Sequence, residues 1–384
     1  MNKIFKFLKV FRKIKYNFFP PKKNSVLLFD NDGSKLALRI FKKNAYEILH
    51  TRKESLNIFI LLITLIKGKF RTIEYYKNYL NYVSPKIVIT FNDNNLDFYE
   101  LKKKISSHFI SVQRGYRSYH NDILQTFKDK KEIYNIDHYF VFNEAIKNYL
   151  KNYLNSNFTL HGSVENNFYP LKKNIIKNRE IIYISSHAIQ IFNKMKISQK
   201  EKLDFYKIEL DVLNNLILFC KKNNYRFSIL AKHRNEKNKK LERNFFESGL
   251  SGSFNYIENH HSRNTYEILD SAFLSIGTHS TILYENFSRG NRTFVFNFRH
   301  EKYPFNTKTF GYFSKLPAHG EIWYKGKNID FFLKKINEIL SYNHSQWEDI
   351  LKKYESDTCQ YNFGNTILKE YLKKNLINKN IIND

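Results

Sequence analysis

Short apolar runs alternate with longer stretches of helical periodicity through the first half of the chain. Four runs, at residues 25–29, 86–91, 108–112 and 137–142, end in polar or turn-forming residues, and helical patterns follow the first, second and fourth of them. Apolar runs of this length indicate buried strands, and strands that alternate with helices favour βαβ units with a largely parallel sheet. The first half is therefore predicted to be one α/β domain.

The same pattern starts again after residues 166–179, which lack periodicity and are predicted to be a linker. Strands are expected at 180–184, 226–231, 273–276 and 293–298, and helices at 204–223 and 281–289, the last stopped by Gly290. The predicted fold class is α/β, with two Rossmann-like doubly wound domains that face a cleft and additional C-terminal helices. The expected parts are a basic amphipathic segment at 1–24, an N-terminal domain at 25–165, the linker, a C-terminal domain at 180–330 and a helical segment at 331–384.

Polar residues cluster where the predicted strands end. In open parallel sheets ligands bind outside the carboxyl ends of the strands, because loops and helix N-termini converge there. Five clusters occupy such positions: Asp93-Asn94-Asn95, Gln113-Arg114-Gly115, Ser185-Ser186-His187, Lys232-His233 and Gly277-Thr278-His279-Ser280.

Residues 277–281 run from a predicted strand directly into a helix. Gly277 permits close approach of a ligand to the backbone, and Thr278, His279, Ser280 and Thr281 lie beside the unpaired N–H groups of a helix start, which attract anions. This arrangement predicts a nucleotide phosphate site. The alternative is a crossover helix that Ser280 simply caps.

Three neighbouring positions extend this nucleotide site. Glu285 lies about one turn into the helix, where its carboxylate would accept a hydrogen bond from a ribose hydroxyl. Ser185 and Ser186 open the second domain where a phosphate would approach, although a simple turn explains them equally well.

Lys232 and His233 follow a predicted strand and combine a cation with a titratable donor. Both suit a phosphate leaving group, whose developing charge needs stabilisation, so we assign them a catalytic role. In a lysine-rich protein the alternative is an ordinary surface pair.

In the first domain, Asp93 is the candidate general base, since transfer to a hydroxyl needs a carboxylate near the incoming oxygen. An Asx turn explains Asp93 equally well. The candidate acceptor-binding residues have amide or guanidinium side chains that grip polar or anionic groups: Asn94, Asn95, Gln113, Arg114 and Arg117.

No metal or cofactor site is expected. The sequence contains no Gly-x-Gly-x-x-Gly, no P-loop and no His-Glu-x-x-His. Asp30-Asn31-Asp32 has the spacing of a metal-binding Asp-x-Asp motif, but it belongs to the first domain. Cys220 and Cys359 form no Cys-x-x-Cys pair, which fits a reducing cytoplasm.

The net charge of +28 favours polyanionic partners, although the abundance of Lys, Asn, Ile, Phe and Tyr is also typical of AT-rich coding sequence. Residues 1–19 lack the apolar core and cleavage site of a signal peptide, and residues 58–66 are too short an apolar run to span a bilayer. On a helix, Phe7, Val10, Phe11 and Ile14 would form an apolar stripe flanked by Lys and Arg, which predicts contact with an anionic membrane surface.

The stretch from Tyr266 to Glu285, with the Arg289-Gly290 stop, resembles the donor-binding segment of GT-B glycosyltransferases of bacterial lipopolysaccharide, O-antigen and capsule biosynthesis. Residues 85–95 and 109–117 resemble the N-terminal half of the same group. The resemblance implies two Rossmann-like domains, with phosphate held by Gly277, Thr278 and Ser280, and ribose held by Glu285. This sequence departs from the group in one respect. His233 is followed by Arg234, where teichoic-acid polymerase-like relatives often have His-Pro, so the donor class stays open.

These observations predict a glycosyltransferase that moves a sugar from a nucleotide-sugar donor to a glycan or lipid-linked glycan acceptor, located in the cytoplasm at the inner face of the plasma membrane. A polyol-phosphate transferase that uses a CDP-glycerol-type donor is an alternative on the same fold. An RNA-binding protein is a weaker alternative, because RNA binding needs aromatic and basic residues on the strand bodies, which here are aliphatic.

Overall fold

The computed structural model describes residues 14–52, 54–69, 71–117, 123–171, 177–187, 199–278, 280–298, 317–376 and 379–383. The chain forms two compact units. The first contains Met1–Arg114, Gln125–Val164 and Asn365–Asp384, and the second contains Gly115–Leu124 and Glu165–Gly364. The end of the chain, expected as part of a separate helical segment, thus belongs to the first unit.

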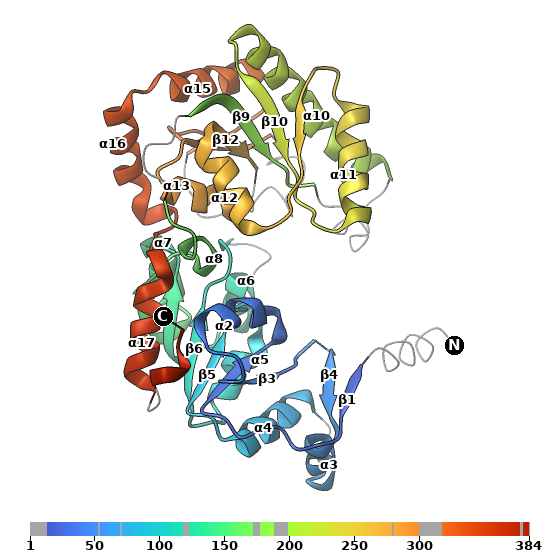
Figure 1. Cartoon of the computed structure of the whole chain (residues 1–384), viewed down its shortest axis with the longest axis vertical. Helices are drawn as coiled ribbons and strands as arrows, with labels where there is room; N and C mark the ends of the chain where they lie inside the picture. The colour runs from blue at the N-terminus through green and yellow to red at the C-terminus, as the bar shows by residue number, and fades with distance from the viewer. Residues whose placement is uncertain are drawn as a thin grey trace. The chain divides into compact units, whose positions relative to one another are not determined.

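A six-stranded parallel sheet forms the centre of the first unit (Figure 1). Its strand order is β3-β2-β5-β6-β7-β8. The strands are β2 (Val26–Phe29), β3 (Glu47–Leu49), β5 (Ile87–Thr90), β6 (His108–Val112), β7 (Tyr134–Val141) and β8 (Leu154–Leu160). The helices of this unit are α2 (Ser34–Ile40), α3 (Ile58–Ile66), α4 (Thr72–Val83), α5 (Leu96–Lys102), α6 (Ile123–Lys130), α7 (Glu144–Leu150) and α17 (Thr366–Asn375).

A second, two-stranded sheet pairs β1 (Lys15–Asn17) with β4 (Ser55–Asn57) in parallel. The start of the predicted amphipathic helix, including Phe7, Val10 and Phe11, lies outside the described residues. Lys15–Asn17 is extended, so any helix in this segment ends before Lys15.

The last helix, α17, packs on the first sheet through aromatic rings. Tyr371 lies against His138, with ring centroids 4.1 Å apart, and its hydroxyl is 2.8 Å from Nε2 of His108. Buried His161, at the end of β8, has Nε2 2.9 Å from Oδ1 of Asn365. These contacts explain why the chain terminus belongs to the first unit.

We expect His161 to make the stability of the protein pH-dependent. Burial lowers the pKa of His161 from 6.5 to about 4, which the bond to Asn365 only partly offsets. In the unfolded chain the imidazole takes up its proton near pH 6.5, so stability falls as the pH falls from about 6.5 towards 4. The free energy of unfolding should contain a loss of roughly 2–3 kcal/mol at pH 4.5 relative to pH 7 that His161→Gln removes.

Urea unfolding at both pH values checks this expectation, with exposed His260 changed to Gln as the matched control. Identical pH dependence in the wild type and His161→Gln would show that His161 does not contribute.

The second unit also has a six-stranded parallel sheet, with the order β11-β10-β9-β12-β13-β14. The strands are β9 (Asn178–Ile184), β10 (Arg226–Leu230), β11 (Asn255–Ile257), β12 (Ala272–Gly277), β13 (Thr293–Asn297) and β14 (Trp323–Lys325). The helices are α8 (Val164–Asn167), which begins at the boundary between the units, α10 (Gln199–Lys222), α11 (Glu236–Gly249), α12 (Ser262–Ser271), α13 (Thr281–Ser288), α15 (Ile329–Ser341) and α16 (His344–Tyr354).

Aromatic side chains join the helices of the second unit to its sheet. Tyr183 of β9 packs on Phe246 of α11, and Phe296 of β13 packs on Phe332 of α15. Helices α12 and α13 lie in front of the strands in Figure 1. Both units have the architecture of a doubly wound α/β domain, which confirms the predicted fold class.

Candidate functional site

The second sheet reverses its strand order at β9, which lies between β10 and β12. Such a switch point opens a crevice at the carboxyl ends of the strands, where ligands bind. Side chains join the loops at this point: the Thr278 hydroxyl donates to the Ser186 hydroxyl, 2.9 Å away. His233 Nε2 donates to the carbonyl of His187 at 3.1 Å. Three of the polar clusters predicted from the sequence therefore meet at one edge of the sheet.

Gly277 allows close packing at the start of α13. A Cβ on Gly277 would lie 3.0 Å from Leu283 and 3.2 Å from the Ile184 carbonyl, so only glycine fits without displacement. Thr281 Oγ1 accepts a hydrogen bond from the Tyr116 N–H at 3.3 Å. Ser280 occupies the N-cap position, but its side chain makes no capping bond. The alternative in which Ser280 caps α13 through its hydroxyl is therefore wrong, and His279 lies outside the described residues.

Glu242, which the sequence analysis missed, holds the Lys232-His233 loop. The Glu242 carboxylate is fully buried and accepts the backbone N–H groups of Lys232 and His233 at 3.0 and 3.1 Å. Hydrophobic periodicity does not reveal its position, because two of the three residues in the buried stripe of α11, Lys239 and Glu242, are charged. A carboxylate in such a stripe needs hydrogen-bond donors, and the loop supplies them.

The Lys232 side chain reaches the surface, while neighbouring protein atoms crowd its ammonium group. This crowding lowers the pKa of Lys232, and the charges of Glu242 and Glu209 partly counteract the effect. Ser185, Ser186 and His187 are all buried. The loops at this edge are thus fixed by internal contacts, and Lys232 is an accessible cation beside them.

Glu285 lies in the second turn of α13 and is 5% exposed. Its Oε2 accepts a hydrogen bond from the Tyr266 hydroxyl at 2.8 Å. Burial, followed by the charge of Glu285, raises the pKa of Tyr266 well above its ordinary value, so Tyr266 stays a donor. Tyr266 therefore orients the carboxylate that the sequence analysis assigned to the ribose.

Replacing Glu285 by alanine should weaken nucleotide affinity by about 1–3 kcal/mol, the cost of a charge-assisted hydrogen bond. Calorimetric titration of the folded variant with nucleotide measures this affinity. Tyr266→Phe is the matched control, because it removes the internal partner and keeps the carboxylate. Unchanged affinity in Glu285→Ala would exclude the ribose role, and equal losses in both variants would indicate an effect of the local network.

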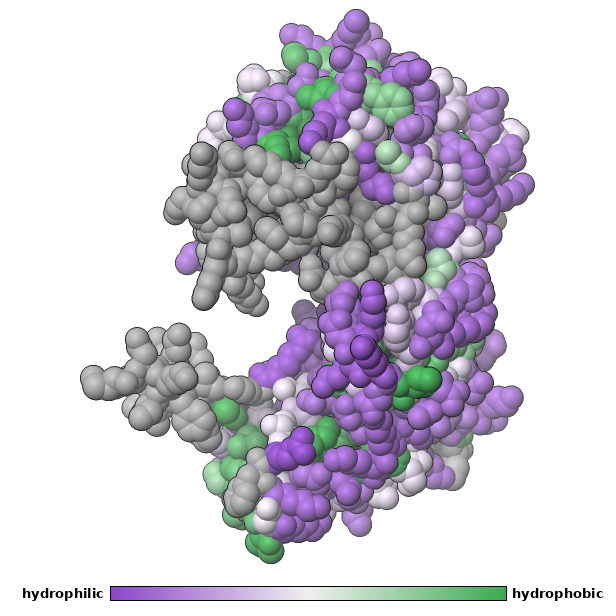
Figure 2. All heavy atoms as spheres, turned by 180° about the vertical axis from the view of Figure 1, so that it is seen from behind, coloured by the Kyte–Doolittle hydropathy of each residue, from purple (hydrophilic) through white to green (hydrophobic). Residues whose placement is uncertain are grey.

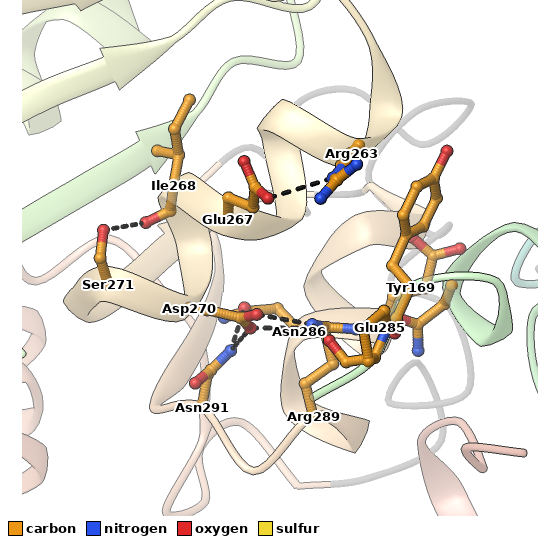
Figure 3. Close-up of polar contacts among 12 residues, drawn as sticks. Tyr169, Arg263, Glu267, Ile268, Asp270, Ser271, Glu285, Asn286, Arg289 and Asn291 are labelled. Atoms are coloured by element: carbon orange, nitrogen blue, oxygen red, sulfur yellow. Dashed lines mark hydrogen bonds and ion pairs between the residues drawn. The ribbon is translucent and has the colours of Figure 1, made fainter. Parts of the chain in front are cut away.

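A buried ion pair lies one turn beyond Glu285 (Figure 3). Arg289 Nε and Nη2 contact the two oxygens of Asp270 at 2.8 and 2.5 Å, and both side chains are almost fully buried. Arg289 also donates to Oδ1 of Asn166 and to the carbonyls of Tyr169 and Pro170 at 3.0–3.1 Å. It therefore fastens the start of the predicted linker to α12 and α13.

The first sheet has its own switch point, between β2 and β5. Here Asn92 Nδ2 donates to Asp30 Oδ2 at 2.8 Å, and Arg52 Nε donates to the same oxygen at 2.9 Å. Asp30 is fully buried and has φ of 84°, a conformation that is costly for a non-glycine residue and occurs preferentially at functional sites. The Asp30-Asn31-Asp32 motif thus belongs to a polar cluster at this edge, which the sequence analysis did not foresee.

Asp93 is fully buried in the same cluster. Its Oδ2 accepts from the Tyr139 hydroxyl at 2.6 Å, and its Oδ1 accepts from the Arg114 N–H at 3.2 Å. Asp32, by contrast, is partly exposed, and its Oδ2 lies 2.5 Å from Nη1 of Arg114 and 3.1 Å from Nη2 of Arg52. Asp93 therefore holds the loop after β6 in place, and Asp32 presents a carboxylate to the surface.

The predicted acceptor residues separate into internal and accessible groups. Gln113 is fully buried and accepts from the Phe142 N–H at 2.8 Å, which fixes β6 to β7, and Arg117 is also buried. Asn95 caps α5 through its side chain. Asn94 and Arg114 are exposed. Arg114 is therefore the candidate that combines exposure with a direct place in the cluster.

Among the residues that the structure describes, no group of three or more His, Cys, Asp or Glu side chains is arranged to hold a metal ion. Metal-independent chemistry stays a prediction, because the sequence analysis inferred it from motifs alone.

Solved structures with TM-scores above 0.5 establish the fold class. A "putative UDP-N-acetylglucosamine 2-epimerase" from Listeria monocytogenes has a TM-score of 0.54 at 11% identity, covering 91% of this chain and 96% of that one. The S. aureus MnaA–UDP co-structure has a TM-score of 0.52 with the same identity and coverage. The wall teichoic acid polymerase TagF, soaked with CDPG, has a TM-score of 0.48 at 11% identity, covering 92% and 88%. The protein has a GT-B-like fold of two Rossmann-type domains.

The family match is more specific. Residues 110–376 match the model of a family described as "putative O-antigen biosynthesis protein", and the chain belongs to this family. Among curated proteins, none matches the sequence. The resemblance to surface-carbohydrate biosynthesis proteins of the GT-B type is thereby confirmed.

Proposed function

We propose that this protein is a glycosyltransferase that moves a sugar from a nucleotide-sugar donor to a surface polysaccharide or lipopolysaccharide acceptor. The observation that carries the proposal is the joining of the β9 and β12 loops through Thr278 and Ser186, at the start of α13. A loop-to-helix junction at a switch point is a phosphate site in doubly wound folds. Membership of an O-antigen biosynthesis family makes a nucleotide-activated sugar the natural source of that phosphate.

In this proposal the second unit binds the nucleotide. The diphosphate accepts hydrogen bonds at the start of α13 from Gly277, Thr278, His279, Ser280 and Thr281, and the positive end of the helix dipole stabilises its charge. Ser185 and Ser186 lie on the opposing loop, and Glu285 accepts from the ribose. The buried Arg289-Asp270 pair maintains the helices that present these groups.

Lys232 and His233 assist departure of the nucleotide. When the bond between the anomeric carbon and the phosphate oxygen breaks, the electron pair stays on the phosphate, whose charge increases. Lys232 supplies a cation, and His233 supplies a donor when its Nε2 leaves the His187 carbonyl. Glu242 acts as a positioning residue, because it holds both backbone N–H groups of the loop.

The first unit binds the acceptor in this proposal. Asp93, the general base expected from the sequence, is better suited to positioning, because its carboxylate is buried and both oxygens accept hydrogen bonds. Asp32 is the accessible carboxylate of the cluster and is our preferred base for the attacking hydroxyl. Arg114, Asn94 and Asn95 are proposed to contact the acceptor.

Nucleotide binding tests the proposal at its first step. Calorimetry with CMP, UDP, CDP and GDP should give saturable binding to at least one of them, and Thr278→Val, which removes the bridging hydroxyl, should weaken it. Chelation by EDTA should not abolish turnover. No binding of any nucleotide, or tighter binding of single-stranded RNA than of each nucleotide, would contradict the proposal.

Two rival reactions are possible on the same fold. One is epimerisation of UDP-N-acetylglucosamine, after the name of a structural neighbour, and the other is transfer from a CDP-linked polyol phosphate, the alternative given by the sequence. An epimerase converts its nucleotide sugar without an acceptor, and a polyol-phosphate transferase adds a phosphate-linked polyol, and no sugar, to its acceptor. Product analysis with and without an acceptor therefore distinguishes both reactions from glycosyl transfer. We further propose that the protein acts in the cytoplasm, at the inner face of the plasma membrane, where a lipid-linked acceptor would be presented.

A further inference from the structure

Helix α3 (Ile58–Ile66) leaves most of its apolar side chains partly or fully exposed. Eight of its nine residues are apolar, yet only Ile60 and the one polar residue, Thr64, are buried. Leu62, Leu65 and Ile66 are 53%, 40% and 85% exposed. An ordinary surface helix exposes polar side chains, whereas the exposed positions of α3 are all apolar.

Polar contacts help to hold α3 in place. The Thr64 hydroxyl donates to the Ile60 carbonyl at 2.8 Å and accepts from Asn78 Nδ2 at 3.0 Å. Lys67 Nζ donates to Asn78 Oδ1 at 3.0 Å. Asn78 belongs to α4, so α3 is attached to the unit through hydrogen bonds near its C-terminal end. Apolar contacts add to this attachment, because Ile60 is fully buried and the ring of Phe59 lies 5.2 Å from that of Tyr82 on α4.

Two phenylalanines lie beside the start of α3. Strands β1 and β4 are parallel, so the chain leaves both at the same edge, towards Phe18-Phe19 from β1 and towards α3 from β4. Asn57 joins the two: its Nδ2 donates to the Phe19 carbonyl at 2.9 Å, and its Oδ1 accepts the Ile60 N–H at 3.1 Å. Phe18 and Phe19 are 70% and 85% exposed. Figure 2 shows hydrophobic side chains gathered at this corner of the first unit.

Exposed basic side chains flank these apolar residues on both sides along the chain. They are Lys15, Lys22 and Lys23 around the phenylalanines, and Lys67, Lys69 and Arg71 after α3. Apolar side chains that protrude between basic residues are typical of segments that lie in the interface of anionic membranes. Within the described residues no helix is both long and apolar enough to cross a bilayer.

We propose that Phe18, Phe19, Leu62, Leu65 and Ile66, together with their basic flanks, form a docking surface for an anionic lipid bilayer. The phenylalanines and the outer face of α3 insert among the headgroups, and the basic residues contact lipid phosphates. We infer that an anionic lipid surface is the partner because of charge. The chain carries a net charge of +28, and basic side chains precede and follow these apolar residues along the chain. The inference goes beyond the proposed reaction, does not depend on it, and is distinct from the stripe expected within residues 1–14.

Vesicle sedimentation with the full chain tests the docking surface without any nucleotide or acceptor. The probe is a vesicle of equal parts phosphatidylglycerol and phosphatidylcholine at roughly 0.15 M salt. We expect Leu62→Ser/Ile66→Ser to weaken binding at least about fivefold, and Phe18→Ser/Phe19→Ser to do the same independently. Leu218→Ser/Leu241→Ser is the matched control, because it changes two exposed leucines of the second unit and should bind like the wild type.

Three results would overturn the inference. The first is equal sedimentation of the wild type and both docking-surface variants, with unchanged melting curves. The second is loss of binding on deletion of residues 2–13 while both docking-surface variants bind normally, which would assign the membrane contact to that segment. The third is a wild-type dimer that Leu62→Ser/Ile66→Ser converts to a monomer without any change in vesicle binding, which would make this surface a contact between two copies.

Discussion

Replacing Arg289 by alanine should lower the free energy of unfolding by about 3–5 kcal/mol, the largest stability effect expected for a single substitution in the second unit. The reason is that Asp270, with 5% of its side chain exposed, would keep a buried charge without its partner. The substitution also removes the hydrogen bonds to Asn166, Tyr169 and Pro170, which fasten the connecting segment to the unit. Urea unfolding monitored by circular dichroism measures the change.

Arg243→Ala is the matched control, because Arg243 forms an ion pair with Glu247 on the exposed side of α11. Loss of this exposed ion pair should lower the free energy of unfolding by no more than about 0.5 kcal/mol. If Arg289→Ala does not fold, Arg289→Lys serves in its place. It keeps the charge but loses the bidentate contact with Asp270, so its free energy of unfolding should lie below that of the wild type by less than the loss expected for Arg289→Ala. A loss in Arg289→Ala no larger than that in Arg243→Ala would contradict the role of the buried pair.

Alanine at Lys232 or His233 should reduce kcat by roughly 10²–10³-fold and leave the KM for the donor nearly unchanged. The charge of the leaving phosphate is fully developed only in the transition state, so groups that stabilise it act mainly on turnover. Steady-state kinetics with the donor selected by calorimetry gives both constants.

Lys240→Ala tests whether the effect is specific, since Lys240 is an exposed lysine on the adjacent α11, and its variant should keep wild-type kinetics. Glu242→Gln separates positioning from direct action. It leaves both catalytic side chains present but replaces a carboxylate that accepts two N–H groups, so we expect a smaller loss in kcat. A rise in KM with kcat unchanged for Lys232→Ala and His233→Ala would assign these residues to ground-state binding and contradict their role in nucleotide departure.

The central strands could be predicted from sequence because they are buried on both faces. The expected strand at 108–112 corresponds to β6 (His108–Val112), and the expected helix at 281–289 corresponds to α13 (Thr281–Ser288). The stop at Gly290 is confirmed by its φ of +83°, which glycine adopts without strain. The edge strands β8, β11 and β14 were not predicted. Strand β8 has a mixed polar sequence and a partly exposed surface, and β11 and β14 have only three residues each.

The sequence predicted where the polar clusters of the site lie, but it did not predict which hydrogen-bond partners they have. Strand ends show where loops converge, which is why Ser186 and Thr278 were found together although they are far apart in sequence. Asp30 was set aside because its motif lies in the first domain, away from the predicted nucleotide site, whereas its φ of 84° and its bonds to Asn92 and Arg52 appear only in three dimensions. Glu242 was missed for the same reason, since an acidic residue in an amphipathic helix is usually exposed.

Transfer of labelled sugar tests the central claim most directly. The protein is incubated with the nucleotide sugar whose nucleotide binds best and with a lipid-linked glycan fraction, and label is followed in the donor and the acceptor. The proposed function predicts that label appears in the acceptor as nucleotide is released in equal amounts, and that Lys232→Ala/His233→Ala abolishes both. Conversion of the donor to an epimer without an acceptor, or the absence of labelled acceptor with any nucleotide sugar that binds, would contradict it.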